Sequence, residues 1–444
     1  MQQEFCWPWV QEQVAHSIDI WNRSAAPSLH TSRSYSQREQ QQRERAFHKK
    51  LATAESQIKK HYRSCAVTTD AWNRLAPVFT CFAETALDLE PEAVRLVNDS
   101  FLPAARKFAS LAKQFDASLG VAEIVQACRS AWTACGLQIM LGDRMEVSAA
   151  ILAYSLLYPY SDNYIDRFDV SLQAKRRFSQ RFKDRLCGRK PPCLNHREAA
   201  IWTLVEIIEG QFPRQHYPQV YDCLLAIHRA QEESMAQLDL SGGCTDIEVH
   251  RITAAKGGTS VLTDACLAHG SLNEEESSFA FLWGVLLQLG DDLQDVREDW
   301  QNGSATVFTR ALASGTPLDA PVAQLLNFSH KVGAEMEMLP NASPVLQNLM
   351  KRSWQSLITC AVAESHKLFT PAFLRKVETS SPFRFNFLRE HRARLARQQY
   401  LWPTLIEYAE APELAASIPC TAQPFLGPSQ QTEIPLGTLP PLTM

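Results

Sequence analysis

The stretch FAFLWGVLLQLGDDLQDVREDWQNG, residues 279–303, joins an apolar segment to a run of acids. Residues 279–289 are apolar nearly all the way round a helix, which is typical of a helix buried in a core. Upstream, Asn273 and Glu276 have the spacing of an N-terminal capping box, and Gly303 follows the last periodic position. These signals predict one continuous helix between Asn273 and Gly303 that leaves the core as it becomes acidic.

Five acids crowd the last turns of this predicted helix. Like charges one turn apart destabilise a helix, and the single arginine among them, Arg297, cannot offset them all. A solvated acidic face is the plain interpretation, but these acids continue directly from a buried helix. Asp291, Asp295 and Asp299 form one row along the helix. Gln288, Asp292 and Asp295 form the adjoining row.

A second acidic pair lies in YSDNYIDR, residues 160–167, where Asp162 and Asp166 are one helical turn apart. It too follows an apolar segment, AAILAYSLLY, residues 149–158. Two buried helices can bring their acids to one cavity mouth, where the carboxylates repel each other unless cations bind. Oxygen ligands suit Mg²⁺, and the absence of histidine and cysteine from both stretches argues against zinc. We therefore expect a magnesium site.

A helical pattern over residues 246–270 contains Lys256 followed by Gly257 and Gly258. The two glycines predict a break in the helix, and a plain loop between two helices is the simplest form of such a break. If a new helix starts there, its free amides would attract an anion. Lys256 is the first candidate for binding that anion, with Thr259 and Ser260 as weaker ones.

Composition favours an all-α, soluble protein. Glycine is scarce, with 17 in 444 residues, and apolar residues recur at helical spacing with no series of alternating strands. The net charge of -4 gives no overall basic field for nucleic acid, and no apolar run reaches the roughly 18 to 20 residues of a membrane span. The N-terminus lacks the features of a signal peptide, and the cysteines show no CxxC pair, so we expect a cytoplasmic protein.

Three regions are expected along the chain. Residues 1–70 contain a polar, glutamine- and arginine-rich piece and are predicted to form an N-terminal helical extension. Residues 71–410 carry the helical periodicity and both acidic stretches, and are predicted to form one large helical bundle. Residues 411–444 are rich in proline and predict a flexible tail.

The later acidic stretch resembles motifs of the class I isoprenoid synthases. Gln288-Leu-Gly-Asp291-Asp292-Leu-Gln-Asp295 is similar to the QxxDDxxD motif of chain-elongating prenyl diphosphate synthases. The row of Asp291, Asp295 and Asp299 resembles the metal-binding triad of terpene cyclases. The whole run is also similar to the second motif of squalene and phytoene synthases, so the subfamily stays open.

The earlier stretch, Asp162-Asn163-Tyr164-Ile165-Asp166-Arg167, resembles the DNxxDR element of bacterial large-terpene synthases of the tetraprenyl-curcumene type. The resemblance implies an all-α barrel in which two facing motifs bind three Mg²⁺ ions that hold the diphosphate of an allylic prenyl substrate. It implies as metal ligands Asp162, Asp166, Asp291, Asp292, Asp295 and Asp299, of which Asp162, Asp166 and Asp295 with Lys256 carry the catalysis. Diphosphate would be bound by Lys256, Arg167, Arg310, Thr259 and Ser260, and the pocket lined by Tyr158, Phe281, Gln288 and Asn163.

The expected activity is that of a terpene synthase, which converts one prenyl diphosphate to a hydrocarbon or alcohol. Chain elongation is disfavoured because the basic glycine-lysine-arginine stretch of those enzymes is missing and Asn163 replaces a second aspartate. Head-to-head condensation is disfavoured because Pro159 and Tyr160 stand where paired arginines are expected. A non-catalytic helical binding protein is the remote alternative, and a homodimer stays open.

Overall fold

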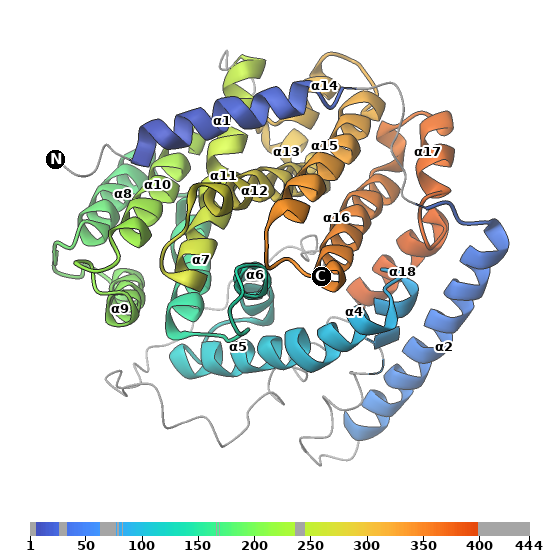
Figure 1. Cartoon of the computed structure of the whole chain (residues 1–444), viewed down its shortest axis with the longest axis horizontal. Helices are drawn as coiled ribbons and strands as arrows, with labels where there is room; N and C mark the ends of the chain where they lie inside the picture. The colour runs from blue at the N-terminus through green and yellow to red at the C-terminus, as the bar shows by residue number, and fades with distance from the viewer. Residues whose placement is uncertain are drawn as a thin grey trace.

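The computed structural model describes residues 6–25, 33–62, 77, 80–81, 83–165, 167, 169–235 and 245–397. Within those ranges every regular element is a helix, which confirms the predicted all-α class (Figure 1). The helices are α1 (Cys6–Asn22), α2 (Gln37–Tyr62), α4 (Pro91–Leu96), a π-helical turn (Val97–Phe101), α5 (Leu102–Phe115), α6 (Val121–Met140), α7 (Ala149–Ile165), α8 (Leu172–Leu186), α9 (His196–Gln211), α10 (Pro218–Ser234), α11 (Asp246–His269), α12 (Glu274–Gln294), α13 (Val296–Asn302), α14 (Val307–Ala313), α15 (Asp319–Met338), α16 (Pro344–Glu364), a 3-10 turn (His366–Leu368), α17 (Pro371–Glu378) and α18 (Phe385–Arg397). None of the described helices is long and apolar enough to cross a membrane.

Helices α11 and α12 cross at very short range in the centre of the bundle. A Cβ atom added to Gly284 of α12 would overlap the carbonyl oxygen of Gly257 on α11, and one added to Gly258 would overlap the ring of Phe281. Helix α11 runs unbroken through both of its glycines, so the predicted break there is wrong. The glycines serve close packing of two backbones, which compensates for their poor helix propensity.

The acidic end of α12 departs from the expected single helix. The capping box is confirmed: the Asn273 side chain accepts a hydrogen bond from the Glu276 amide at 2.9 Å, and the Glu276 carboxylate accepts one from the Asn273 amide at 3.0 Å. The helix ends at Gln294, however, and α13 starts after Asp295, whose ψ of 7° leaves the helical region. The break falls where like-charged side chains crowd, which disfavours a regular one-turn row.

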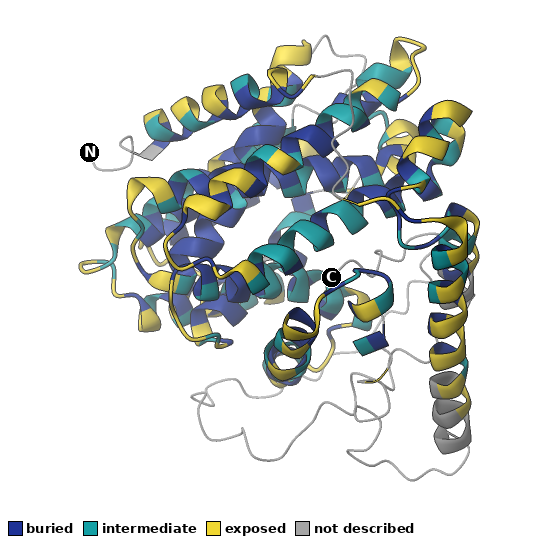
Figure 2. Cartoon of the chain, turned by 45° about the vertical axis from the view of Figure 1, so that its right-hand side comes forward, coloured by how far each residue is buried: buried dark blue, intermediate teal, exposed yellow. Residues whose placement is uncertain are grey.

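Helix α1 packs into the main core. Its side chains at helical spacing, Trp7, Val10, Val14 and Trp21, are all buried there. Trp9 packs edge-on against Phe281 of α12, with ring centroids 6.0 Å apart, and donates a hydrogen bond to a carboxylate of α12. Figure 2 shows the buried face of α1 turned toward the bundle and its exposed face outward. The expected boundary at residue 70 therefore does not separate α1 from the core.

Helix α2 is largely exposed and meets the C-terminal helices through a second, smaller cluster (Figure 2). Phe47 and Leu51 of α2 pack there against Phe383, and Glu44 accepts hydrogen bonds from Arg384 at 3.0 Å. These contacts tie the polar N-terminal segment to the other end of the chain. The predicted tail over residues 411–444 lies outside the described residues.

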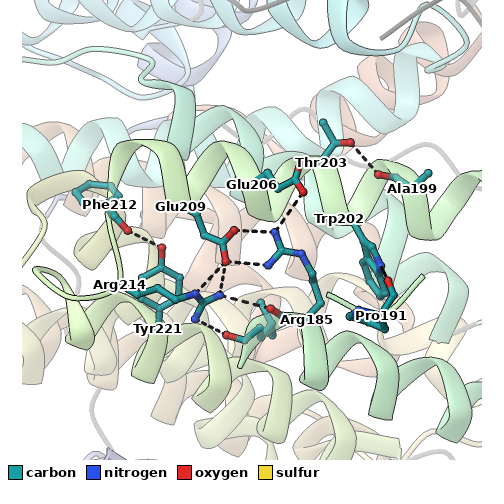
Figure 3. A network of polar contacts seen from close by, with 11 residues as sticks. Arg185, Pro191, Ala199, Trp202, Thr203, Glu206, Glu209, Phe212, Arg214 and Tyr221 are labelled. Carbon is teal, nitrogen blue, oxygen red and sulfur yellow. Dashed lines mark hydrogen bonds and ion pairs between the residues drawn. The ribbon is translucent and has the colours of Figure 1, made fainter. Parts of the chain in front are cut away.

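A buried ionic network holds α8, α9 and α10 together beside α7 (Figure 3). Arg185, only 1% exposed, donates to both oxygens of Glu209 at 2.8 and 2.7 Å. Arg214 donates to the same carboxylate at 2.7 Å and to the Leu186 carbonyl at 2.6 Å. The guanidinium of Arg214 also lies 3.8 Å from the ring centre of Tyr221. The network satisfies charges that would be costly to bury alone.

Candidate metal and diphosphate site

Helix α6 connects the two helices that carry the acidic stretches. Near its middle, Arg129 donates a hydrogen bond to the Asp291 carboxylate of α12 at 2.7 Å. One turn earlier, Gln126 exchanges amide hydrogen bonds with Asn163 of α7 at 3.3 and 3.4 Å. Residues three apart lie on the same side of a helix, so Asn163 of α7 and Asp291 of α12 lie beside the same stretch of α6.

The first acidic stretch can be placed only in part. Asp162 is half-buried on α7 and accepts a hydrogen bond from the Ser161 hydroxyl at 3.0 Å. Its negative charge contributes to raising the phenol pKa of Tyr154, two turns earlier on the same helix, although burial of Tyr154 and the charge of Asp264 contribute more. Helix α7 continues through Pro159. Asp166 and the side chain of Tyr158 lie outside the described residues.

Asp292 is the buried member of the second acidic stretch. Gln288 donates a hydrogen bond to it at 2.8 Å, and the Thr253 hydroxyl of α11 donates at 3.4 Å. Burial raises the pKa of Asp292 to about 7, repulsion by Asp291 adds to the shift, and the positive charge of Lys256 opposes it. The carboxyl group is therefore partly protonated near neutral pH unless a cation favours its charged form.

The carboxyl pKa values of Asp295 and Asp299 are raised as well. Asp295 is an exposed residue at the junction of α12 and α13, but the surrounding protein partly desolvates its carboxyl group. This desolvation raises the pKa of Asp295 to about 7, and repulsion by Asp291 and Glu298 adds to the shift. The pKa of Asp299 is raised to about 8, first by desolvation and then by Asp292 and Asp295. Acids that resist ionisation because they repel each other are a donor set that a divalent cation would stabilise.

Lys256 and Ser260 lie one turn apart on α11, each half-buried. The charge of Lys256 lowers the pKa of Asp292, which shows that its side chain is near the second acidic stretch. The Ser260 carbonyl accepts a hydrogen bond from the Tyr154 hydroxyl at 3.3 Å. Thr259, in contrast, is fully buried and donates its hydroxyl hydrogen to the Ala255 carbonyl at 2.6 Å, within its own helix.

The remaining candidate residues contact partners other than the two acidic stretches. Arg167 is exposed and donates to Asp169 at 2.8 Å. Arg310 donates to Asp246 at the start of α11 at 2.7 Å. Phe281 is fully buried against Gly258, so the structure gives its ring a packing role in the crossing of α11 and α12.

Arg129 is a site residue that the sequence did not reveal. It lies in the middle of an ordinary amphipathic helix, and no local pattern distinguishes it from a surface arginine. Only the packing of α6 between α7 and α12 brings it to Asp291.

Among the residues that the structure describes, no group of three or more histidine, cysteine or carboxylate side chains is already gathered in a geometry that could hold a metal ion. Mg²⁺ does not require such a cage, because it keeps several waters and is typically held by one or two carboxylates together with substrate phosphate. The oxygen donors present at the ends of α7 and α12 have the chemistry that Mg²⁺ prefers.

Comparison with known proteins adds no relative. No protein-family model, no curated protein and no solved structure matches the chain.

Proposed function

We propose that the protein is a Mg²⁺-dependent terpene synthase. It ionises an allylic prenyl diphosphate, releases diphosphate and converts the carbocation to a terpene hydrocarbon or alcohol. The observation that carries the proposal is the position of α6, whose Gln126 and Arg129 contact Asn163 of α7 and Asp291 of α12 respectively. Each of two acidic stretches far apart in the sequence thus has one residue beside the same stretch of α6.

The acids at this end supply oxygen ligands for the metal. Asp162 would provide them from α7, with Asp166 expected from the motif, and Asp291, Asp292, Asp295 and Asp299 from α12 and α13. When bound there, Mg²⁺, expected as three ions, supplies positive charge that stabilises the departing diphosphate.

Other residues orient the acids, add positive charge or exclude water at the site. Gln288 and Thr253 fix the orientation of the Asp292 carboxyl group through hydrogen bonds. Lys256 adds a positive charge on the α11 side, where it can attract the diphosphate. The buried apolar faces of α7 and α12 exclude bulk water, which would otherwise quench the carbocation at any position.

The test is incubation of the purified protein with Mg²⁺ and allylic prenyl diphosphates of increasing chain length, with and without isopentenyl diphosphate. Diphosphate release is measured and the products are identified by mass spectrometry. The expected result is a hydrocarbon or alcohol from one substrate, with isopentenyl diphosphate left unconsumed. A longer prenyl diphosphate would assign the protein to chain elongation, and a symmetrical dimer to head-to-head condensation. Absence of diphosphate release from every substrate would reject catalysis of this class.

A further inference from the structure

A polar cluster lies in the core where α6, α7 and α11 meet. The Ser130 hydroxyl of α6 donates a hydrogen bond to the Asp264 carboxyl group of α11 at 2.9 Å. The Ser155 hydroxyl of α7 donates to the Ser130 hydroxyl at 3.3 Å. Asp264 and Ser155 are buried, with 3% and 1% of their surface exposed, and the surroundings of the three side chains are mostly apolar. We name Ser130, Ser155 and Asp264 the inner polar cluster.

The inner polar cluster is aligned with the proposed metal and diphosphate site. On α11, Lys256, Ser260 and Asp264 form one row at four-residue spacing, so Asp264 lies two turns, or roughly 12 Å, from Lys256. On α7, Tyr154 lies the same two turns from Asp162. A prenyl chain whose diphosphate is held at the acidic end would extend along these two rows toward the cluster.

Tyr154 lies between the two sites. Its hydroxyl donates to the Ser260 carbonyl, which is halfway between Lys256 and Asp264 on α11. The pKa of its phenol is raised well above its ordinary value by burial first, then by the negative charges of Asp264 and Asp162. Tyr154 is therefore close enough to both carboxyl groups for their charges to change its pKa.

Ser130 is the member of the inner polar cluster that keeps solvent-accessible surface. Helix α6 lies in the middle of the bundle, surrounded by other helices (Figure 1). Nevertheless Ser130 on α6, Tyr154 on α7 and Ser260 on α11 all keep accessible surface and are only half-buried.

The chemistry of the cluster suits one bound water. Burial raises the pKa of Asp264 well above its ordinary value, which favours the protonated carboxyl group, and that form can both donate and accept a hydrogen bond. The hydroxyls of Ser130 and Ser155 add further donors and acceptors. A buried water needs two to four polar partners, and the inner polar cluster offers three.

We propose that Ser130, Ser155 and Asp264 hold the water molecule that captures the carbocation, so that the product is an alcohol. This inference rests on the proposed function and specifies its product. A lone pair of the water oxygen forms the new C–O bond, and one water O–H bond breaks. The proton passes through the hydrogen-bonded cluster and ends on the released diphosphate. One prenyl diphosphate and one water thus give one alcohol and one protonated diphosphate.

The experiment compares products formed in water enriched in oxygen-18. The native protein should release an alcohol that carries the label. The double variant Ser130→Ala, Ser155→Ala should lower the ratio of alcohol to hydrocarbon about tenfold or more, since it removes two of the hydrogen bonds that position the water. Asp264→Asn keeps a neutral hydrogen-bonding group and should retain most of the alcohol, whereas Asp264→Leu should lose it.

The matched control is Ser17→Ala, which removes a buried hydroxyl of α1 whose hydrogen bond goes to the Gln13 carbonyl. It should leave the product ratio unchanged. Because the readout is a ratio of products, partial unfolding of a variant lowers the total yield without changing the ratio. Diphosphate release with hydrocarbon alone, or an unchanged alcohol share in the double variant, would overturn the water site and leave the proposed function standing. Failure to release diphosphate from any substrate would instead overturn the proposed function.

Discussion

Arg129 of α6 donates a hydrogen bond to Asp291 of α12 at 2.7 Å, three residues along α6 from the contact of Gln126 with Asn163 of α7. The side chains of Arg129 and Asp291 are both about one-third exposed. The positive charge of Arg129 also opposes the raised pKa of Asp295. The arginine thus partly neutralises the acids, and it links α6 to the second acidic stretch.

Removal of this arginine should increase the dependence of stability on Mg²⁺. We expect Arg129→Gln to lower the free energy of unfolding of the metal-free protein by less than about 1 kcal/mol, because the ion pair is partly exposed to solvent. Added Mg²⁺ should raise the melting temperature of the variant by more than that of the native protein. Arg95→Gln, which removes an exposed pair with Glu92, is the control and should show no such difference.

The close crossing of α11 and α12 should not tolerate a methyl group. Gly284→Ala should lower the free energy of unfolding by about 2 to 3 kcal/mol, because the new Cβ atom overlaps the backbone of Gly257 and the helices must move apart. Gly210→Ala on α9 is the matched control, since nothing lies within 4 Å of its added Cβ atom. That variant should be neutral or more stable by up to about 1 kcal/mol. Equal effects in urea denaturation would contradict the crossing.

His228 should make the protein sensitive to acid. Burial lowers its pKa from 6.5 to about 4, Lys183 adds to the shift, and Glu232 opposes it. The Ser179 hydroxyl lies 3.3 Å from the ring nitrogen Nε2, and Phe182 packs edge-on against the ring. Since the unfolded chain binds the proton more readily, this contribution to stability is complete above pH 6.5 and is lost as the pH falls toward 4.

The loss should reach about 3 kcal/mol of unfolding free energy. Denaturation curves between pH 4 and 7 measure it, and His228→Gln should flatten the decline over this interval. An equally steep decline in the variant would assign the acid sensitivity to other groups.

The ionic network beside α7 should respond differently to single and paired substitutions. Glu209→Leu leaves the buried guanidinium of Arg185 without its carboxylate and should cost about 3 to 5 kcal/mol of unfolding free energy. The double variant Arg185→Met, Glu209→Leu should recover only part of that loss, because apolar side chains replace the pair of Arg185 and Glu209 while Arg214 still lacks the carboxylate it bonds to. Additive losses in a double-mutant cycle would show that the two residues act independently.

Local sequence signals predict the helices but not the positions at which the helices break. The capping box of Asn273 and Glu276 is a local signal and was read correctly. Gly257 and Gly258 carry the same local signal whether they end a helix or admit a second backbone, and only Gly284 on another helix decides between these outcomes. The break at Asp295 likewise depends on where the crowded acids point, which helical spacing alone does not give.

That the acids of α7, α12 and α13 form one site stays a prediction, and the partners of these acids were not predictable from the sequence. The arginine that meets Asp291 and the carboxyl group of Asp264 lie in helices with no distinctive pattern, so their roles emerge only from packing. The helical spacing of Trp7, Val10, Val14 and Trp21 is typical of a buried helix face. The polar segment that follows them led instead to the prediction of a separate N-terminal extension.

The central claim is that the acids of α7, α12 and α13 form one catalytic metal site. Its most direct test is the rate of Mg²⁺-dependent diphosphate release by Asp162→Ala and Asp295→Ala, measured beside Asp19→Ala, which removes an exposed acid of α1. We predict that both site variants lose more than about a hundredfold in rate, while the control keeps the native rate and all three keep the native helical circular dichroism. Native rates in the site variants, or loss of their helical structure, would contradict the account.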